Sequence, residues 1–443
     1  KLSSGYKINR AADDAAGLTI SEKMRKQIRG LDKASSNAQD GVSSVQTAEG
    51  ALTEVHSMLQ RMNELATQAA NGTNSADDRS AIQDEVDQLT TEIDRVAETT
   101  KFNEIYLLKG DDSSTKNVYM KGHDAGLKGS LTDGAKTATF MMDTLKEGDQ
   151  YTIAGKEYTI GSAQGDLEAL IDKADKELTA AAAGTKDVEI DGKKYTLTYK
   201  AGGNTIADAG GNAVADLATL KGKIAAGSKV TYGNTTLTAM NDVNGDGVDD
   251  DDDSIITTAV AKSKIKAELV TANNIGTTDH AATVADGVDD AAGKTSYTIT
   301  KGYATVANTL SFNLHVGADA DMTNKINVSI DTMNSSNLGI KNLNVTDGTG
   351  TAATYAIDAI ADAVSKVSSQ RSALGAVQNR LEHTIDNLDN ISENTSSAES
   401  RIRDTDMAKE MVNYSKNNIL AQAGQSMLAQ ANQSNQGVLS LLQ

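Results

Sequence analysis

Two interleaved rows of small and apolar residues, each repeating every seven positions between Leu31 and Ala69, limit the folds open to this chain. The rows consist of Leu31, Ala38, Val45, Leu52, Leu59 and Ala66, and of Ala34, Gly41, Ala48, Val55, Met62 and Ala69. Their alternating spacings of three and four put both rows on one stripe of an α-helix. At about 1.5 Å per residue this helix is roughly 60 Å long. A helix with so long and narrow a stripe needs partner helices, so we expect a helical bundle.

A second helix is expected to return along the first. We expect residues 1–17 to form a loop and the first helix to begin near Leu18. Gly72 is predicted to end it in a left-handed conformation, and Ser75 followed by Asp78 predicts a capping box for the next helix. That helix carries apolar residues at alternating spacings, namely Ile82, Val86, Leu89, Ile93 and Val96. Because the connection is short, the two helices should pack antiparallel.

The middle of the chain has a different character, rich in Gly, Thr, Asp and Ala. Segment 103–108 resembles a strand. Three hairpin patterns follow, and each precedes a possible helix. The hairpins are predicted at 151–160, 188–197 and 230–237, and the helices at 167–178, 214–224 and 259–269. We interpret this region as small α+β domains.

Helical periodicity returns near the other end of the chain. Segments 310–316 and 326–330 alternate as a β-hairpin would. A strict seven-residue row then follows, made of Ile360, Val367, Leu374, Leu381 and Leu388. Arg371 and Gln378 interrupt the flanking row, either as polar residues of the interface or as the rim of the stripe, and the rim is favoured. A last helix begins near Asp404, and its apolar tip implies a partner surface.

Composition narrows the class of protein. Of 443 residues, 42 are Lys or Arg and 61 are Asp or Glu, and the net charge of −19 argues against a nucleic-acid partner. The chain contains no Cys, which excludes disulfides and thiolate zinc sites, and it contains no apolar run of about 18 residues that would span a membrane. Aromatic residues make up only 3%, which suits thin helical bundles better than one large globule.

The predicted fold is therefore mainly α at both chain ends, as a long coiled-coil-like bundle, with an inserted α+β, β-rich region. We expect an elongated, multi-domain molecule. Its parts are a loop (1–17), the two halves of the bundle (18–110 and 310–402, the second including the β-hairpin), an inserted region (111–309) and a C-terminal helix (403–443).

No catalytic constellation is present, and no cofactor is expected apart from a possible calcium ion. His56 and His383 lie on predicted helices and are interpreted as ordinary surface residues. One segment resembles an EF-hand-type calcium loop, with predicted oxygen ligands at Asp242, Asn244, Asp246, Val248 and Asp253. Position 12 of this loop is Asp253 rather than Glu, which weakens the bidentate ligand. The alternative is a solvated acidic loop, since 249–253 is a run of charges.

Several motifs at both ends resemble those of bacterial flagellins. They are KLSSGYKIN (1–9), DDAAG (13–17), LQRMNELA (59–66), NRL (379–381), SRIRDTD (400–406) and LAQANQ (428–433). The resemblance covers about 1–110 and 310–443, and the middle shows none. It implies that 111–309 is the family's variable region, which projects outward and is here called the projecting region. The family's first helix, about thirty residues long, is expected to be missing from this chain.

The resemblance implies a non-enzymatic structural subunit of the flagellar filament, which serves motility and is extracellular. It implies export through the flagellar type III apparatus with an export chaperone and without a cleaved signal peptide. It also implies inner-core assembly contacts by the last helix, which we place at Met411, Ile419, Leu428, Leu439 and Leu442.

The resemblance further implies recognition by the flagellin-sensing Toll-like receptor of the host. The receptor or subunit interface would comprise Gln60, Arg61, Glu64, Leu65 and Glu85, and the alternative is that Arg61 and Glu64 form a surface pair and that Leu65 flanks the stripe. Three other functions stay open at this point. They are a hook-associated or junction protein of the flagellum, a soluble adhesin or immune ligand, and, less favoured, a chemoreceptor-like signalling hairpin.

Overall fold

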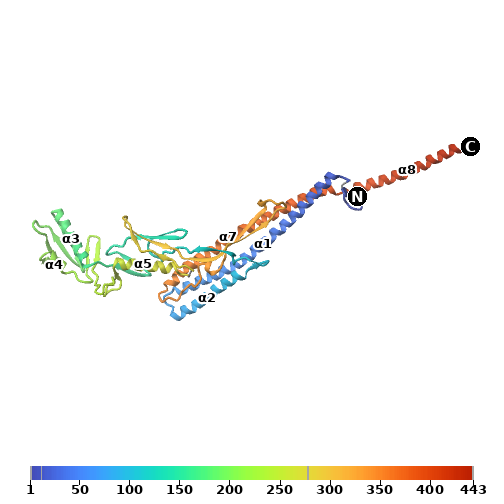
Figure 1. Ribbon diagram of the computed structural model, residues 1–443. Coiled ribbons are helices and arrows are strands. Elements are labelled where there is room, and N and C mark those ends of the chain that lie inside the picture. The colour runs from blue at the N-terminus through green and yellow to red at the C-terminus, as the bar shows by residue number, and fades with distance from the viewer. Residues whose placement is uncertain (1, 11, 277–278, 442–443) are drawn as a thin grey trace.

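The computed structural model describes residues 2–10, 12–276 and 279–441, with side chains through residue 436, and the molecule is elongated (Figure 1). A helical bundle occupies its centre. The β-rich region, with α3 and α4 at its far tip, extends from one end, and helix α8 extends from the other (Figure 1). The predicted arrangement of helical chain ends and an inserted β-rich middle is confirmed.

Helix α1 (Ala15–Ala69) begins three residues earlier than expected, where the side chain of Asp14 accepts a hydrogen bond from the backbone N–H of Gly17. All twelve residues of the two predicted rows are buried. The partner helix is α7 (Thr351–Arg403), whose row from Ile360 to Leu388 is also buried. Three pairs place the helices antiparallel: Ser21 with Glu399, Ser35 with Asp389, and Glu49 with Arg371.

Helix α2 (Ala76–Thr99) returns along the second half of α1 and starts with the predicted capping box of Ser75 and Asp78. The predicted role of Gly72 is wrong, because this residue does not adopt a positive φ. The end of α1 is capped instead by a tertiary contact. The buried guanidinium of Arg79 donates to the carbonyl oxygen of Ala69 (3.2 Å), an acceptor that the helix leaves unpaired, and to that of Asn71 (3.4 Å) just beyond the helix.

Two short hairpins lie against the bundle. Segment 103–108 is not one strand but part of a tight hairpin of β1 (Lys101–Phe102) and β2 (Ile105–Tyr106), because both turn residues, Asn103 and Glu104, have positive φ. The second hairpin confirms the prediction. It pairs β19 (Leu310–His315) with β20 (Lys325–Ile330) around the 3₁₀ turn η1 (Met322–Asn324). Helix α6 (Ser335–Leu338) follows.

The projecting region has a proximal and a distal part. An antiparallel ribbon of β3 (Asp111–Tyr119) and β18 (Tyr303–Asn308) joins it to the bundle. The proximal part packs α5 (Thr258–Asn273) with a five-stranded sheet, of path β15-β17-β5-β4 with β16 beside β17, and with a sheet ordered β14-β7-β6. These strands are β4 (Ser130–Asp133), β5 (Thr137–Asp143), β6 (Gln150–Ile153), β7 (Lys156–Ile160), β14 (Ile255–Ile256), β15 (Thr283–Val284), β16 (Val288–Asp289) and β17 (Lys294–Thr300).

The distal part is a six-stranded antiparallel sheet, ordered β11-β10-β9-β8-β12-β13, that packs on α3 (Gln164–Ala181) and α4 (Leu217–Lys221). Its strands are β8 (Thr185–Ile190), β9 (Lys193–Thr198), β10 (Thr205–Asp208), β11 (Ala213–Val214), β12 (Lys229–Tyr232) and β13 (Thr235–Thr238). The three predicted hairpins and the helices at 167–178 and 259–269 are confirmed. The helix expected at 214–224 is shorter, because 213–214 pairs with β10 and Asp216 caps α4.

Candidate functional site

The Arg61 cluster, which consists of Arg61, Glu64 and Glu85, is exposed where α1 and α2 lie side by side. Arg61 Nε donates to Glu85 Oε1 at 2.8 Å across the two helices, and Arg61 Nη1 donates to Glu64 Oε2 at 3.2 Å along α1. The bonds to Glu85 and then to Glu64 raise the pKa of the Arg61 guanidinium. The two carboxylates therefore hold a permanent cation in a fixed orientation, while all three side chains stay open to solvent.

The other two residues of the predicted interface behave differently. Gln60 is exposed and lies 3.1 Å from the ring of His56. Leu65 is only 2% exposed and belongs to the bundle core, so its assignment to an exposed interface is corrected. Both α7 and α2 cover this half of α1, so the buried face of α1 is wider here than where α7 alone covers it. Leu65 therefore lies beside the predicted rows and inside the core, in agreement with the alternative that it flanks the stripe.

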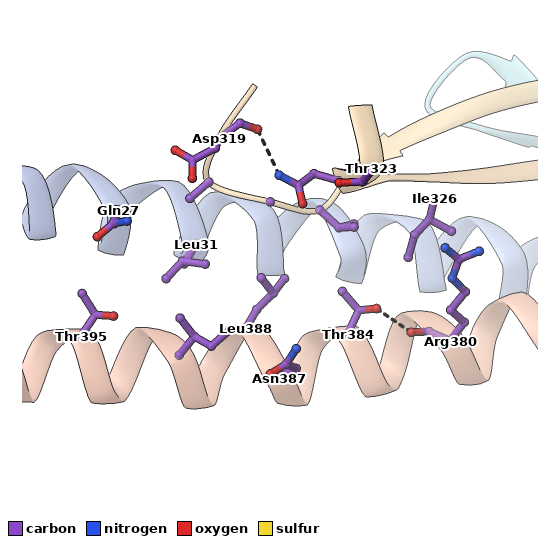
Figure 2. A pocket seen from close by; sticks show the side chains of 15 residues that line it. Gln27, Leu31, Asp319, Thr323, Ile326, Arg380, Thr384, Asn387, Leu388 and Thr395 are labelled. Atoms are coloured by element: carbon purple, nitrogen blue, oxygen red, sulfur yellow. Dashed lines mark hydrogen bonds between the residues drawn. The ribbon is translucent and has the colours of Figure 1, made fainter. Parts of the chain in front are cut away.

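A groove of about 430 Å³, here called the loop groove, lies where the β19–β20 loop crosses α1 and α7. Figure 2 shows Leu31 of α1 and Leu388 of α7 facing one another across the space between the helices, with the loop carrying Asp319 beside them. Both leucines are nearly buried, whereas Ile391 on the rim is 43% exposed. Leu31 and Leu388 thus form a small apolar floor, while most of the other lining residues are polar, among them Asp319 and Arg380.

Helix α8 (Met407–Leu441) has no packing partner among the residues that the structure describes. The predicted assembly residues Met411, Ile419 and Leu428 are 59%, 66% and 65% exposed. Leu442 and the side chain of Leu439 lie outside the described residues. The stretch from Met411 to Leu420 also borders an open apolar surface. Single exposed apolar residues are ordinary, but a contiguous set of this kind indicates a protein contact.

We therefore expect residues 404–443 of the free monomer to be digested first by trypsin. An isolated helix with an unpartnered apolar face is marginal in water, and Lys409 and Lys416 offer exposed cleavage sites along it. Mass spectrometry over a digestion time course should show loss of this tail while fragments of α1 and α7 stay intact. A tail that is as resistant as the bundle would contradict the expectation.

The predicted calcium loop has its oxygens turned toward its own backbone. Asp242 accepts hydrogen bonds from the N–H groups of Gly245, Asp246 and Gly247, and Asp246 accepts one from Val248. Within the described parts of the chain, no group of three or more His, Cys, Asp or Glu residues is placed to hold a metal ion. The calcium site at Asp242, Asn244, Asp246, Val248 and Asp253 stays a prediction.

Sequence reasoning missed the loop groove and the β1–β2 turn. Arg380 and Asp319 belong to different elements, so no local pattern joins them. The turn had a visible signal, since Asn is a favoured first residue of a two-residue hairpin turn, but the expected Gly after it is replaced by Glu104.

Comparison with known proteins gives two family matches. Residues 1–113 match the bacterial flagellin N-terminal helical region, and residues 357–442 match the bacterial flagellin C-terminal helical region. No described helix is long and apolar enough to cross a membrane.

Curated relatives extend the similarity through the middle of the chain. A flagellin of Clostridium tyrobutyricum is 40% identical over 98% of this chain and 93% of its own length. A flagellin of Bacillus subtilis is 35% identical over all of this chain and 90% of its own. Among solved structures, FliC from Burkholderia pseudomallei is 20% identical, with a TM-score of 0.27 and coverage of 77% of this chain and 99% of its own.

Proposed function

This chain belongs to the bacterial flagellin family and is a structural subunit of the flagellar filament, and we propose that its free monomer is also a ligand of the flagellin-sensing Toll-like receptor. Flagellins form the extracellular filament of the bacterial flagellum, and the subunit polymerises with copies of itself. A heterologous contact that does not close into a ring produces an open helical filament of this kind. The receptor proposal concerns the monomer.

The observation that supports receptor binding is the geometry of the Arg61 cluster. Arg61 is held by Glu85 and Glu64 at the junction of two helices but stays about half exposed. Its planar fork of donors is therefore pre-oriented toward a partner, which lowers the entropy cost of binding. Gln60 beside it adds an exposed amide. Leu65 does not contact the receptor in this proposal, and its buried side chain stabilises α1 by packing in the bundle core.

Membership of the flagellin family also leads to proposals about the activity and the export of the subunit. The chain has no catalytic role and needs no cofactor. It is exported unfolded through the flagellar type III apparatus, without a cleaved signal peptide and with an export chaperone as its intracellular partner. These proposals rest on the family and not on a feature of the described fold.

Arg61→Ala is expected to weaken binding of the monomer to the purified receptor ectodomain by about 2 kcal/mol or more, or roughly thirtyfold, because an Arg at the centre of an interface is a common hot spot. The helix should stay intact, since Ala is a better helix former. Surface plasmon resonance measures the affinity, and circular dichroism checks the fold.

Arg95→Ala is a matched control. Arg95 is an exposed arginine of α2 that pairs with Glu92 three residues earlier in the chain, so the variant removes the same group from the same pair of helices outside the Arg61 cluster. Its receptor affinity should match that of the parent. If Arg61→Ala binds as tightly as Arg95→Ala, the Arg61 cluster is not the centre of the receptor site.

A further inference from the structure

The loop groove contains two charged side chains that the fold leaves unpaired. Within residues 2–10, 12–276 and 279–441, the guanidinium of Arg380 and the carboxylate of Asp319 have no hydrogen-bond or ion-pair partner. The two dashed hydrogen bonds in Figure 2 involve backbone oxygens and not these charged groups: the carbonyl oxygen of Arg380 accepts from the side chain of Thr384, and that of Asp319 accepts from the side chain of Asn324. The groove therefore offers an apolar floor at Leu31 and Leu388 with one cation and one anion available above it.

The β1–β2 hairpin carries the complementary groups. Ile105 and Tyr106 are both 44% exposed, while Phe102 packs on the bundle core and fixes the base of the hairpin. Lys101 and Glu104 are exposed and likewise have no ion-pair partner among the described residues. Because directly paired residues share a face, Ile105 lies on the side of Phe102, and Tyr106 lies on the outward side with Lys101. The hairpin thus presents one cation, one anion and one large aromatic side chain.

The backbone of this turn is strained at the residue that carries the anion. Asn103 has a φ of 45° and Glu104 a φ of 68°. A turn with positive φ at both central residues favours Gly at the second one, because a side chain with a Cβ fits poorly there. A residue kept in such a conformation points to a function of its side chain.

The hairpin and the groove of one molecule are too far apart to meet. Helix α2 runs back from the end of α1 for 24 residues, so the hairpin that follows it lies beside α1 near Val45. Leu31 is 14 residues further toward the start of α1, which is about 20 Å along the helix. The hairpin can therefore reach this groove only in another copy of the chain.

We propose that the β1–β2 hairpin of one subunit docks into the loop groove of a second copy, with Glu104 facing Arg380, Lys101 facing Asp319, and Tyr106, which shares the outward face of the hairpin with Lys101, covering Leu31 and Leu388. This inference rests on the chain being a filament subunit and is independent of receptor binding. It places neighbouring bundles side by side with an axial offset of about 20 Å. Opposite charges in this arrangement fix the register between copies.

A charge exchange tests the contact between Glu104 and Arg380. Glu104→Arg alone and Arg380→Glu alone should each weaken self-association of the full chain at least tenfold, because each single change places like charges opposite one another. The double variant should recover most of the loss, since the pair is restored in reverse. Sedimentation velocity over a concentration series measures association. Absence of association in the parent, or single variants that associate like it, would overturn the proposal.

Cross-linking locates the contact directly, because the chain has no native cysteine. A Glu104→Cys chain mixed with an Arg380→Cys chain should give a covalent dimer with a short bismaleimide. Glu393→Cys supplies the control, since Glu393 is an exposed residue of the same helix α7 outside the groove. Equal yields from the two mixtures would contradict the proposed docking.

Glu104→Gly separates docking from folding. Removing the side chain relieves the positive-φ strain, so the melting temperature of the monomer should stay the same or rise, while self-association should weaken. A loss of monomer stability without a change in association would mean that Glu104 serves the fold of the hairpin and not the neighbouring subunit.

Discussion

Leu52→Asp is expected to lower the free energy of unfolding of the bundle by about 5 kcal/mol or more. Leu52 is fully buried in the main core cluster, near the middle of α1. The substitution removes three apolar carbons and places a carboxylate among the apolar neighbours of the main core cluster. Denaturant unfolding followed by the far-ultraviolet circular dichroism of the helices measures the loss.

Two control variants separate the charge from the lost packing. Leu52→Ala removes the apolar contacts without adding a charge and should cost about 3 kcal/mol. Ser57→Asp adds the same charge on an exposed face of α1 and should change stability by about 0.5 kcal/mol at most. Burial raises the pKa of a carboxyl group, so the deficit of Leu52→Asp should shrink at acid pH, where the group is neutral. If the denaturant midpoint of unfolding for Leu52→Asp equalled that of the parent, the stripe would not be buried.

The long helices could be predicted because the apolar pattern that specifies them is local and repeats along the sequence. The two rows between Leu31 and Ala69 each repeat every seven residues without exception, and so does the row from Ile360 to Leu388. All three rows proved to be buried. Arg371 also lies at the rim as predicted, where it reaches Glu49 at 2.7 Å.

The errors arose where a distant residue decides the local structure. Gly72 is a reasonable helix terminator by composition, but Arg79 of the next helix supplies donors to the last carbonyl groups, so no left-handed residue is needed. Leu65 falls outside the two rows, yet two helices instead of one cover that part of α1. Neither the tertiary cap nor the second covering helix leaves a periodic signal.

The two candidate surfaces, the Arg61 cluster and the loop groove, also differ in whether the sequence alone could reveal them. The Arg61 cluster could be proposed from sequence, because Arg61 and Glu64 are neighbours on one helix, and the family resemblance supplied Glu85. The loop groove could not, because its charged residues come from α7 and from the turn of a hairpin some sixty residues earlier in the chain. Their proximity, and the absence of a described partner for either, becomes visible only after the hairpin has been packed against both long helices.

Asp133→Ala is expected to destabilise the proximal part of the projecting region by about 3 kcal/mol. The ammonium group of Lys301, whose side chain is only 6% exposed, lies 2.9 Å from Asp133 Oδ1 and 3.1 Å from the carbonyl oxygen of Gly134. In the Asp133→Ala variant, the buried ammonium group of Lys301 keeps one neutral acceptor, the carbonyl oxygen of Gly134. The near-ultraviolet circular dichroism of the tyrosines, several of which, including Tyr297, are buried in the same core, follows unfolding of this part. The far-ultraviolet helical signal of the bundle should not change at low denaturant.

Lys301→Met shows whether the loss comes from the unpaired cation or from the missing carboxylate. Met keeps most of the apolar stem, and the Asp133 carboxylate that remains is about one-third exposed and can be hydrated, so this variant should cost about 1 kcal/mol at most. The double variant Asp133→Ala, Lys301→Met should then be more stable than Asp133→Ala alone, because no charge is left buried. Additive losses in the double variant would mean that the two side chains stabilise the sheet separately and that their ion pair contributes little.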